Sequence, residues 1–387
     1  GVEYQVSALP FRAYNLIYNE WFRDQNLQSS LATSQSDGPD NASFYIVRNR
    51  GKRHDYFTSS LPWPQKSDSG AVTIPLGTRA EIHTQSGQGL PIAVYSDNNL
   101  QYRDLEGQGT GNPVVLALTE NTDLTQRLYA DLTDATSATI NQLRQSIAVQ
   151  RLFEKDARGG TRYIEVIKSH FGVTSPDLRL QRPGYLGGGS TPINISPVAQ
   201  TAPPAEAEST PQGNLAGIGT LSASGHGFTK SFTEHTIIIG LAAVRADLTY
   251  QRGIERSWSR KTRFDFFWPE LATIGEQEVL NKEIFTQGND DDDKVFGYQE
   301  RFAEYRYKPS LITGKFRSTD PQSLDFWHLS QDFGTLPVLG DVFIQDNPPI
   351  DRVVATPDEP QFKLDSYFKL QCARPMPMYG IPGLSRL

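Results

Sequence analysis

Basic side chains mixed with aromatic side chains form two clusters in this sequence. The first cluster contains Arg48, Arg50, Lys52 and Arg53, followed by His54, Tyr56 and Phe57. The second contains Arg256, Arg260, Lys261 and Arg263, interleaved with Trp258, Phe264 and Trp268. Cations of this kind contact phosphates, and rings stack on bases. Both clusters are therefore candidates for nucleic-acid contact, and the alternative for each is intersubunit salt bridging or simple solvation.

No catalytic motif in the sequence has the residue spacing that its chemistry requires. Residues 225–231 look like a phosphate loop, but Thr229 stands before Lys230 where that loop needs glycine, so a β-turn is favoured. Residues 187–190 lack the G-x-S-x-G spacing of a nucleophile elbow. The histidines form no metal-binding pair, and the lone Cys372 cannot form a thiolate site by itself. We predict no catalytic residue, no bound metal and no cofactor.

Four adjacent carboxylates, Asp290 to Asp293, precede Lys294. Like charges so close together need solvent, a cation or a basic partner. A calcium loop would need alternating ligands, a central glycine and a terminal glutamate, none of which fit. An exposed loop tip is the favoured interpretation, with a cation site as the alternative.

Composition limits the partners of the chain. The 387 residues include 37 Lys and Arg against 44 Asp and Glu, a net charge of −7, which argues against nucleic acid over the whole surface. No apolar run approaches the ~18 residues of a membrane span, so we expect no membrane insertion. A single cysteine excludes a disulfide framework.

Helices are predicted mainly in the first half. Phe11, Tyr14, Tyr18, Trp21 and Phe22 recur at helical spacing after Pro10, which predicts a helix with a core-facing aromatic stripe. A second helix, with Thr136 as N-cap and an apolar stripe from Ile140 to Phe153, should end at Gly159 and Gly160. A third should cover residues 161–170 and stop at Gly172, and a short fourth should begin at residues 175–177.

Strands are predicted mainly in the second half. The candidate runs are residues 43–47, 236–239, 241–250, 264–268, 298–307, 341–345 and 367–372. Residues 67–125 have a polar, alternating texture that suggests strands and turns outside the main fold. This order predicts a mainly β fold with long helical and loop insertions.

Several blocks of sequence resemble a known family. They are residues 10–24, 51–59, 61–65, 157–163, 169–177, 185–192, 296–301, 304–309 and 374–377. In this order they are similar to the major capsid protein of gokushoviruses, small icosahedral single-stranded DNA phages of the Microviridae. The similarity spans nearly the whole chain except about residues 84–125.

The resemblance implies a fold and a role. It implies an eight-stranded jelly roll of the viral capsid type over residues 1–387, assembled as sixty copies in a T=1 icosahedral shell around circular single-stranded DNA. It implies no enzyme activity, and a small basic internal protein that shares the DNA contact. Family members carry early jelly-roll strands before the equivalent of Tyr4, so we expect those strands to lie outside this sequence. The shell would form in the reducing bacterial cytoplasm and become part of the virion.

The stretch 84–125 lies where gokushoviruses insert a surface loop that forms threefold protrusions. The resemblance therefore implies contact with a host surface receptor, and we single out Thr84, Gln88, Tyr95, Asn98, Tyr102 and Asn112. The alternative is an ordinary variable loop. Residues 199–217 are expected to be a long mobile loop, and residues 374–387 an extended C-terminal tail that lies across a neighbour.

Two other classes of function stay open at this point. A carbohydrate-binding module would share the jelly-roll architecture. A β-rich hydrolase could use scattered carboxylates such as Glu300 and Glu304, although no paired-acid signature supports it.

Overall fold

The structure, a computed structural model, describes residues 4–66, 81–84, 93–96, 101–107, 114–120, 128–131, 140–174, 182–199, 215–247, 249–354 and 358–375. The chain divides into two compact units. Unit 1 comprises Gly1–Pro183, Arg252–Pro309 and Phe333–Gln345. Unit 2 comprises Gly184–Gln251, Ser310–Asp332 and Asp346–Leu387. The predicted helix starts at Thr136 and at residues 175–177 lie outside the described residues.

The first helix of unit 1, α1 (Leu9–Ile17), begins with Pro10 in its first turn and continues into a π-helical turn, Tyr18–Phe22. This confirms the predicted helix, but its aromatic stripe is only partly buried. Tyr18 is buried, whereas Phe11 and Trp21 are about half exposed. The prediction of a core-facing aromatic stripe is therefore wrong for these two rings.

Two asparagines occupy the buried side of this helix instead. Asn15 is fully buried, and its side-chain amide donates to the carbonyl oxygens of Ala32 and Phe44, at 2.9 and 3.1 Å. Asn19, one turn later, donates to the Leu31 carbonyl and accepts from the Leu31 amide, both at 2.8 Å. Because buried backbone groups need partners, these amides hold the following loop against the helix.

Two further helices follow the predicted order. Helix α2 (Ile140–Gly159) ends at the predicted glycines, and α3 (Tyr163–Phe171) stops at Gly172, whose φ of +70° suits glycine. A Cβ on Gly159 would lie 2.6 Å from the Ser169 Cβ. Glycine at this position therefore permits the close packing of α2 and α3.

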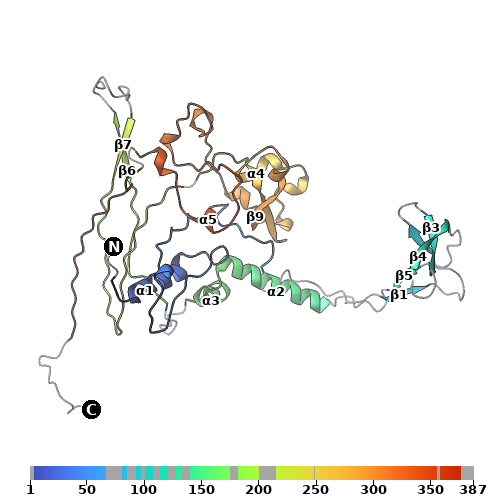
Figure 1. The fold of residues 1–387 in the computed structure, drawn as a ribbon, viewed down its shortest axis with the longest axis horizontal. Helices are drawn as coiled ribbons and strands as arrows, with labels where there is room; N and C mark the ends of the chain where they lie inside the picture. The colour runs from blue at the N-terminus through green and yellow to red at the C-terminus, as the bar shows by residue number, and fades with distance from the viewer. Residues whose placement is uncertain are drawn as a thin grey trace, which may run out of the picture. The chain divides into compact units, whose positions relative to one another are not determined.

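The core of unit 1 surrounds a short antiparallel pair, β8 (Glu276–Leu280) and β9 (Val295–Glu300). Helix α4 (Asn281–Ile284) follows β8 directly, and α5 (Asp341–Ile344) packs nearby (Figure 1). Val279 and Ile284 are fully buried. Rings complete this core: Phe57 meets Phe296 edge-on, and Phe296 meets Phe343.

The described strands between residues 81 and 131 form two further sheets. Strands β1 (Glu81–Thr84) and β5 (Leu128–Asp131) pair antiparallel, with Thr84 opposite Leu128. Strands β2 (Ala93–Ser96), β3 (Gln101–Gly107) and β4 (Val114–Glu120) form a three-stranded antiparallel sheet. The expected strands in this stretch are confirmed, and the β1–β5 pair holds the ends of the predicted insertion together.

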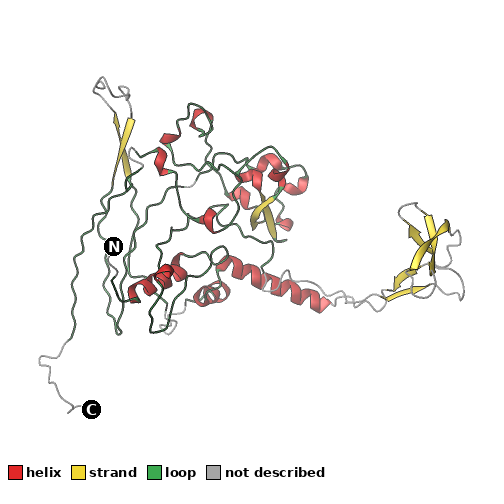
Figure 2. Cartoon of the chain, viewed as in Figure 1, coloured by secondary structure: helices red, strands yellow, loops and turns green. Residues whose placement is uncertain are grey.

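Unit 2 contains little regular structure among its described residues. Strands β6 (Asn194–Ala199) and β7 (Leu215–Thr220) form a hairpin, so the ends of the expected loop 199–217 belong to strands. Residues 221–247 and 358–375 are drawn as loops in Figure 2. Arg352 ties this unit together, because its guanidinium donates to the carbonyl oxygens of His328 and Ser330, at 3.0 and 2.6 Å.

Most of the remaining structure consists of single turns. The described residues include 3₁₀ turns at Ala42–Phe44, Arg256–Ser259, Arg263–Asp265, Pro269–Leu271, Asp290–Asp293, Ala303–Arg306, Gly314–Phe316, Asp325–Trp327 and Ile350–Arg352.

Several predicted strands are wrong. Residues 341–345 are largely helix α5, and 3₁₀ turns occupy part of residues 43–47 and 264–268. Of residues 298–307, only the start belongs to β9. Residues 236–247 and 367–372 form no strand ladder. Apolar runs of four or five residues cannot distinguish a strand from a helical turn.

Within the described residues, the strands form three two-stranded sheets and one three-stranded sheet, without a closed barrel. The mainly β expectation is thus met only in part, since helices and turns account for much of the described chain.

Candidate functional site

The first basic cluster separates into buried and exposed parts. Lys52 is only 7 % exposed, and its Nζ lies 4.3 Å from the ring centroid of Phe343, a cation–π distance. Its backbone amide donates to the Ile344 carbonyl at 2.8 Å. Arg48 and Arg53 are exposed, and Arg50 is exposed with its guanidinium 5.3 Å from the Phe22 ring centroid. Lys52 therefore serves packing in this chain, and the three arginines keep access to solvent.

The second cluster separates in the same way. The Arg256 guanidinium lies 2.7 Å from the Glu283 carboxylate and also donates to the Glu278 carbonyl. Arg260 lies 3.6 Å from the Glu304 carboxylate, and its guanidinium stacks 4.3 Å from the Tyr305 ring centroid. Arg256 and Arg260 thus form ion pairs within the same chain, whereas the alternative considered from the sequence was pairing between subunits.

Lys261 and Arg263 remain exposed beside large rings. Trp258 is 83 % exposed, and the Arg263 guanidinium lies 4.7 Å from the Phe264 ring centroid. The backbone amides of Lys261 and Thr262 donate to the Asp265 carboxylate at 2.9 and 2.7 Å, and these bonds lower the pKa of Asp265. We call residues 258–264 the basic–aromatic surface, since cations and rings lie there together.

A buried carboxylate anchors the base of this surface. Glu283 accepts from the Tyr56 hydroxyl at 3.0 Å, from Arg256 at 2.7 Å and from the Leu280 amide at 2.9 Å. Burial raises the pKa of Glu283, and burial together with this carboxylate raises the pKa of Tyr56. Removing one partner of such a group leaves a buried charge uncompensated. The arrangement is structural, because every oxygen of the carboxylate already has a donor.

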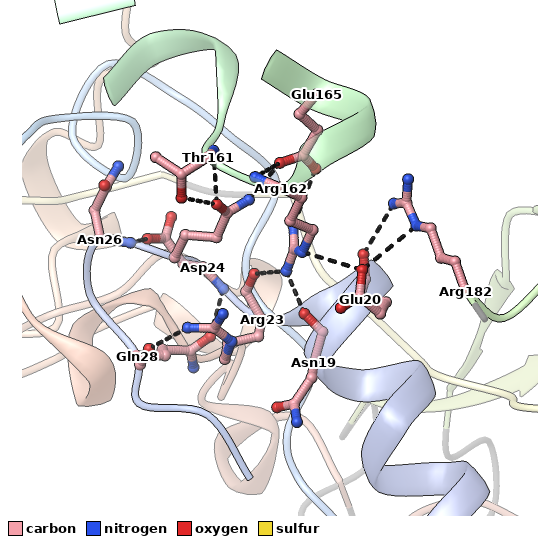
Figure 3. Close-up of polar contacts among 11 residues, drawn as sticks. Asn19, Glu20, Arg23, Asp24, Asn26, Gln28, Thr161, Arg162, Glu165 and Arg182 are labelled. Carbon is pink, nitrogen blue, oxygen red and sulfur yellow. Dashed lines mark hydrogen bonds and ion pairs between the residues drawn. The ribbon is translucent and has the colours of Figure 1, made fainter. Parts of the chain in front are cut away.

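A second polar junction centres on Arg162, at the start of α3 (Figure 3). Its guanidinium donates to the carbonyl oxygens of Asn19 and Arg23, and it lies 3.0 Å from the Glu165 carboxylate. It also lies 3.7 Å from the Glu20 carboxylate. Arg162 therefore joins the end of the first helix to the beginning of α3, more than a hundred residues later in the chain.

Neighbouring groups extend this junction. Arg182 lies 3.5 Å from the same Glu20 carboxylate and 4.5 Å from the Trp21 ring centroid. Gln25 donates to Glu165 at 2.6 Å and accepts from Thr161. A pocket of about 530 Å³ opens beside it, lined by Arg12, Glu20, Arg162, Tyr163 and Arg182 among others. Each of its arginines faces a carboxylate of the same chain, so the pocket lacks an unopposed cation.

Sequence reasoning missed this junction and the buried asparagines. A signal was present, since residues 10–24 and 157–163 both belong to the blocks that carry the family resemblance. Asn15 and Asn19 share one helix face at a spacing of four residues. The sequence prediction instead placed the aromatic side chains of this helix on its buried face.

The acidic run is held by the protein itself. Asp292 is buried and accepts from the backbone amides of Gln287 and Gly288, at 2.8 and 2.7 Å. Asp291 pairs with Lys294 at 2.6 Å, and Asp293 with Lys282 at 2.5 Å. The loop tip is thus only partly exposed. Over the residues that can be described, no group of three or more His, Cys, Asp or Glu is arranged to hold a metal.

The carboxylates considered for hydrolysis have separate partners. Glu300 pairs with Arg306, which lowers the pKa of Glu300. Glu304 is buried and accepts from the Gln277 side chain at 3.0 Å. Neither resembles a free catalytic acid. As far as the described helices go, none has the length and apolarity required to cross a bilayer.

Three of the six attachment candidates lie on described strands of the small sheets between residues 81 and 131. Thr84 ends β1, while Tyr95 in β2 and Tyr102 in β3 are ladder partners. Gln88, Asn98 and Asn112 lie outside the described residues. The backbone thus brings Tyr95 and Tyr102 to one position of a single sheet.

Comparison with known proteins covers nearly the full chain. Residues 2–384 match the family model described as "Capsid protein (F protein)". The chain is 47% identical to the capsid protein VP1 of Bdellovibrio phage phiMH2K, over 98% of this chain and 73% of that protein. It is 42% identical to the capsid protein VP1 of Chlamydia phage 1, over 99% and 75%. The corresponding protein of Spiroplasma virus 4 is 40% identical, over 99% and 74%.

Proposed function

Because this chain belongs to the capsid protein (F protein) family, we propose that sixty copies of it form a T=1 icosahedral shell around a circular single-stranded DNA genome. The observation that carries the proposal is the 47% identity to a phage capsid protein over 98% of the chain. The predicted resemblance to gokushovirus capsid proteins is confirmed, and so is a structural role in the virion rather than an enzymatic one.

We propose that the shell subunit is an eight-stranded jelly roll with helical and loop insertions. The antiparallel pairs β6–β7 and β8–β9 are compatible with it, and the long loops 221–247 and 358–375 would supply further strands. Large side chains on these loops, such as Leu241 and Phe368, are exposed in the single chain. Apolar surface of this extent is typical of a subunit that buries it against neighbours. The tail 374–387 is proposed to lie across such a neighbour.

We propose that the genome meets the basic–aromatic surface together with Arg48, Arg50 and Arg53. Lys261 and Arg263 would neutralise phosphates, and Trp258 would stack on a base. Because the chain carries a net charge of −7, it would not neutralise the genome by itself. A small basic internal protein would supply the remainder, and assembly would take place in the host cytoplasm.

We propose that residues 84–125 form the surface protrusions that meet a host receptor. The support is that β1 and β5 pair next to both ends of this stretch. An insertion with paired ends can vary in length and sequence without disturbing the rest of the subunit.

Particle mass tests the proposed copy number. Purified assemblies weighed by charge-detection mass spectrometry, with the genome removed, should contain sixty chains. A stable monomer, or a broad distribution of open aggregates, would contradict the proposal.

A further inference from the structure

A polar junction in unit 2 is centred on Arg352, and the ring of His328 lies beside it. The Arg352 guanidinium donates to the carbonyl oxygens of His328 and Ser330 and, at 3.1 Å, to the Ser318 hydroxyl. Gln251 joins the same segments, because its side-chain amide donates to the Ser318 hydroxyl at 2.9 Å and to the Ser330 carbonyl at 3.2 Å. All five residues belong to unit 2, and we call them the His328 junction.

Both nitrogens of the His328 ring face partners of fixed polarity. Nε2 lies 2.7 Å from the Phe316 carbonyl oxygen, which can only accept a hydrogen bond. Nδ1 lies 3.1 Å from the backbone amide of Ser330 and 3.3 Å from Nη2 of Arg352, and both of these nitrogens can only donate. A neutral ring with its hydrogen on Nε2 satisfies all three contacts, whereas the other neutral tautomer satisfies none of them.

A proton on Nδ1 would break this arrangement. The charged ring carries a hydrogen on each nitrogen, so its Nδ1–H would point at the Ser330 amide and at the Arg352 guanidinium. Two donors cannot bond to each other, and two cations at this distance repel, more strongly where water is partly excluded. Burial already lowers the pKa of Arg352, so the junction disfavours positive charge before a second cation is added.

The other charged groups around the ring have partners of their own. Asp325 lies 3.5 Å from Nη1 of Arg352, and the attraction of Asp325 and Asp332 opposes the effect of burial on the Arg352 pKa. Both carboxylates thus offset the charge of the arginine. On the side of the carbonyl acceptor, Lys315 and Arg317 donate to groups outside the junction. Arg352 is therefore the charged group that contacts the ring among the described residues.

We propose that the His328 junction is an acid-sensitive switch, closed by the neutral histidine and opened when the ring takes up a proton. Histidine ordinarily takes up a proton near pH 6.5, so the junction should be closed at pH 7.5 and open at pH 5.5. The stability that it contributes is present above this range and is lost as pH falls through it, because only the open junction accepts the charged ring. Opening separates residues 316–318 from residues 328–330 and from Arg352. The proposal concerns one subunit and does not depend on shell assembly.

Hydrogen exchange of the Ser330 amide reports on the junction directly, because this amide donates to Nδ1. Exchange in the full chain is followed by mass spectrometry at pH 7.5 and 5.5, with each rate corrected for the intrinsic pH dependence of exchange. Peptides covering residues 326–332 should exchange roughly tenfold faster at pH 5.5. Peptides from α3 are the internal reference, since His170 lies 2.7 Å from the Asp156 carboxylate and protonation strengthens that pair. Equal corrected rates at the two pH values, or the same acceleration in α3, would overturn the proposal.

His328→Gln is the variant that assigns the response to this ring. Glutamine can still donate toward the Phe316 carbonyl but does not titrate, so the corrected rate near Ser330 should change by less than about twofold between the two pH values. His235→Gln, at an exposed position of the same unit, is the matched control and should keep the full response of the parent. An acid response that persists in His328→Gln would assign it to another group and contradict the proposal.

A measurement on the parent chain decides the matter if His328→Gln does not fold. The hydrogen on the ring carbon between the two nitrogens exchanges slowly, at a rate that depends on the protonation of the ring, and mass spectrometry locates it in individual peptides. The peptide that contains His328 should show the ring neutral at pH 7.5 and charged at pH 5.5. A ring that is already charged at pH 7.5, or still neutral at pH 5.5, would rule out the switch.

Discussion

Asp40 illustrates how single side chains stabilise unit 1. Its carboxylate accepts hydrogen bonds from the Nε and the Nη2 of Arg12, each at 2.6 Å, and from the Tyr45 hydroxyl. The hydrogen bond from Arg12 is the main reason that the pKa of Asp40 falls to about 2. These hydrogen bonds attach the loop that contains Asp40 to helix α1.

This pKa predicts how stability depends on pH. A carboxyl with a lowered pKa contributes stability above its unfolded pKa of about 3.9, and the contribution disappears as pH falls through about 2. We therefore expect Asp40→Asn to lower the free energy of unfolding in urea at pH 7, with a difference from the parent that vanishes near pH 2. Asp37→Asn, at an exposed neighbouring position, is the control. A difference that persists unchanged at pH 2 would contradict this explanation.

The exposed cations of the basic–aromatic surface give a second prediction. The variant Lys261→Glu with Arg263→Glu should still assemble, because neither side chain is buried. It should package at least tenfold less DNA, measured as protected nucleic acid per particle, because phosphates would meet like charge. Arg151→Glu with Lys155→Glu makes the same charge change on the exposed face of α2. Equal packaging by the two variants would exclude this surface from genome contact.

At the scale of elements, the sequence predicts helices better than strands. Helices α1, α2 and α3 are predicted because their apolar stripes run over several turns, and α2 and α3 also end at glycines. The apolar run at residues 341–345 is too short to show a period, and it forms α5 instead. Lys52 and Arg260 show the same limit at the site. Their burial depends on rings distant in sequence, which local spacing does not reveal.

The insertion gives the prediction that belongs to this scale. Since Thr84 and Leu128 are ladder partners in β1 and β5, an Asn-Gly turn can replace residues 85–127 and close the pair as a hairpin. We expect particles of this variant to form normally and to lose most of their adsorption to host cells, measured as free phage remaining after mixing. Normal adsorption would rule out a receptor role, and failure to assemble would assign the stretch to the shell itself. Replacing the loop 200–214 between β6 and β7 by the same turn is the matched control.

At the scale of the whole molecule, a role as a shell subunit accounts for an acidic net charge and exposed apolar segments in the same chain. A chain with a net charge of −7 can enclose DNA if cations are concentrated on the face that meets the genome. On this proposal, the exposed apolar side chains of the loops 221–247 and 358–375 are surfaces that neighbouring copies cover. Disulfides are unnecessary, because many repeated contacts hold a shell together.

Cryo-electron microscopy of particles assembled from this chain tests the central claim most directly. The proposal predicts closed icosahedral shells with one subunit in each of sixty equivalent positions and a jelly roll in each subunit. A chain that remains monomeric, or particles that assemble without icosahedral symmetry, would contradict it.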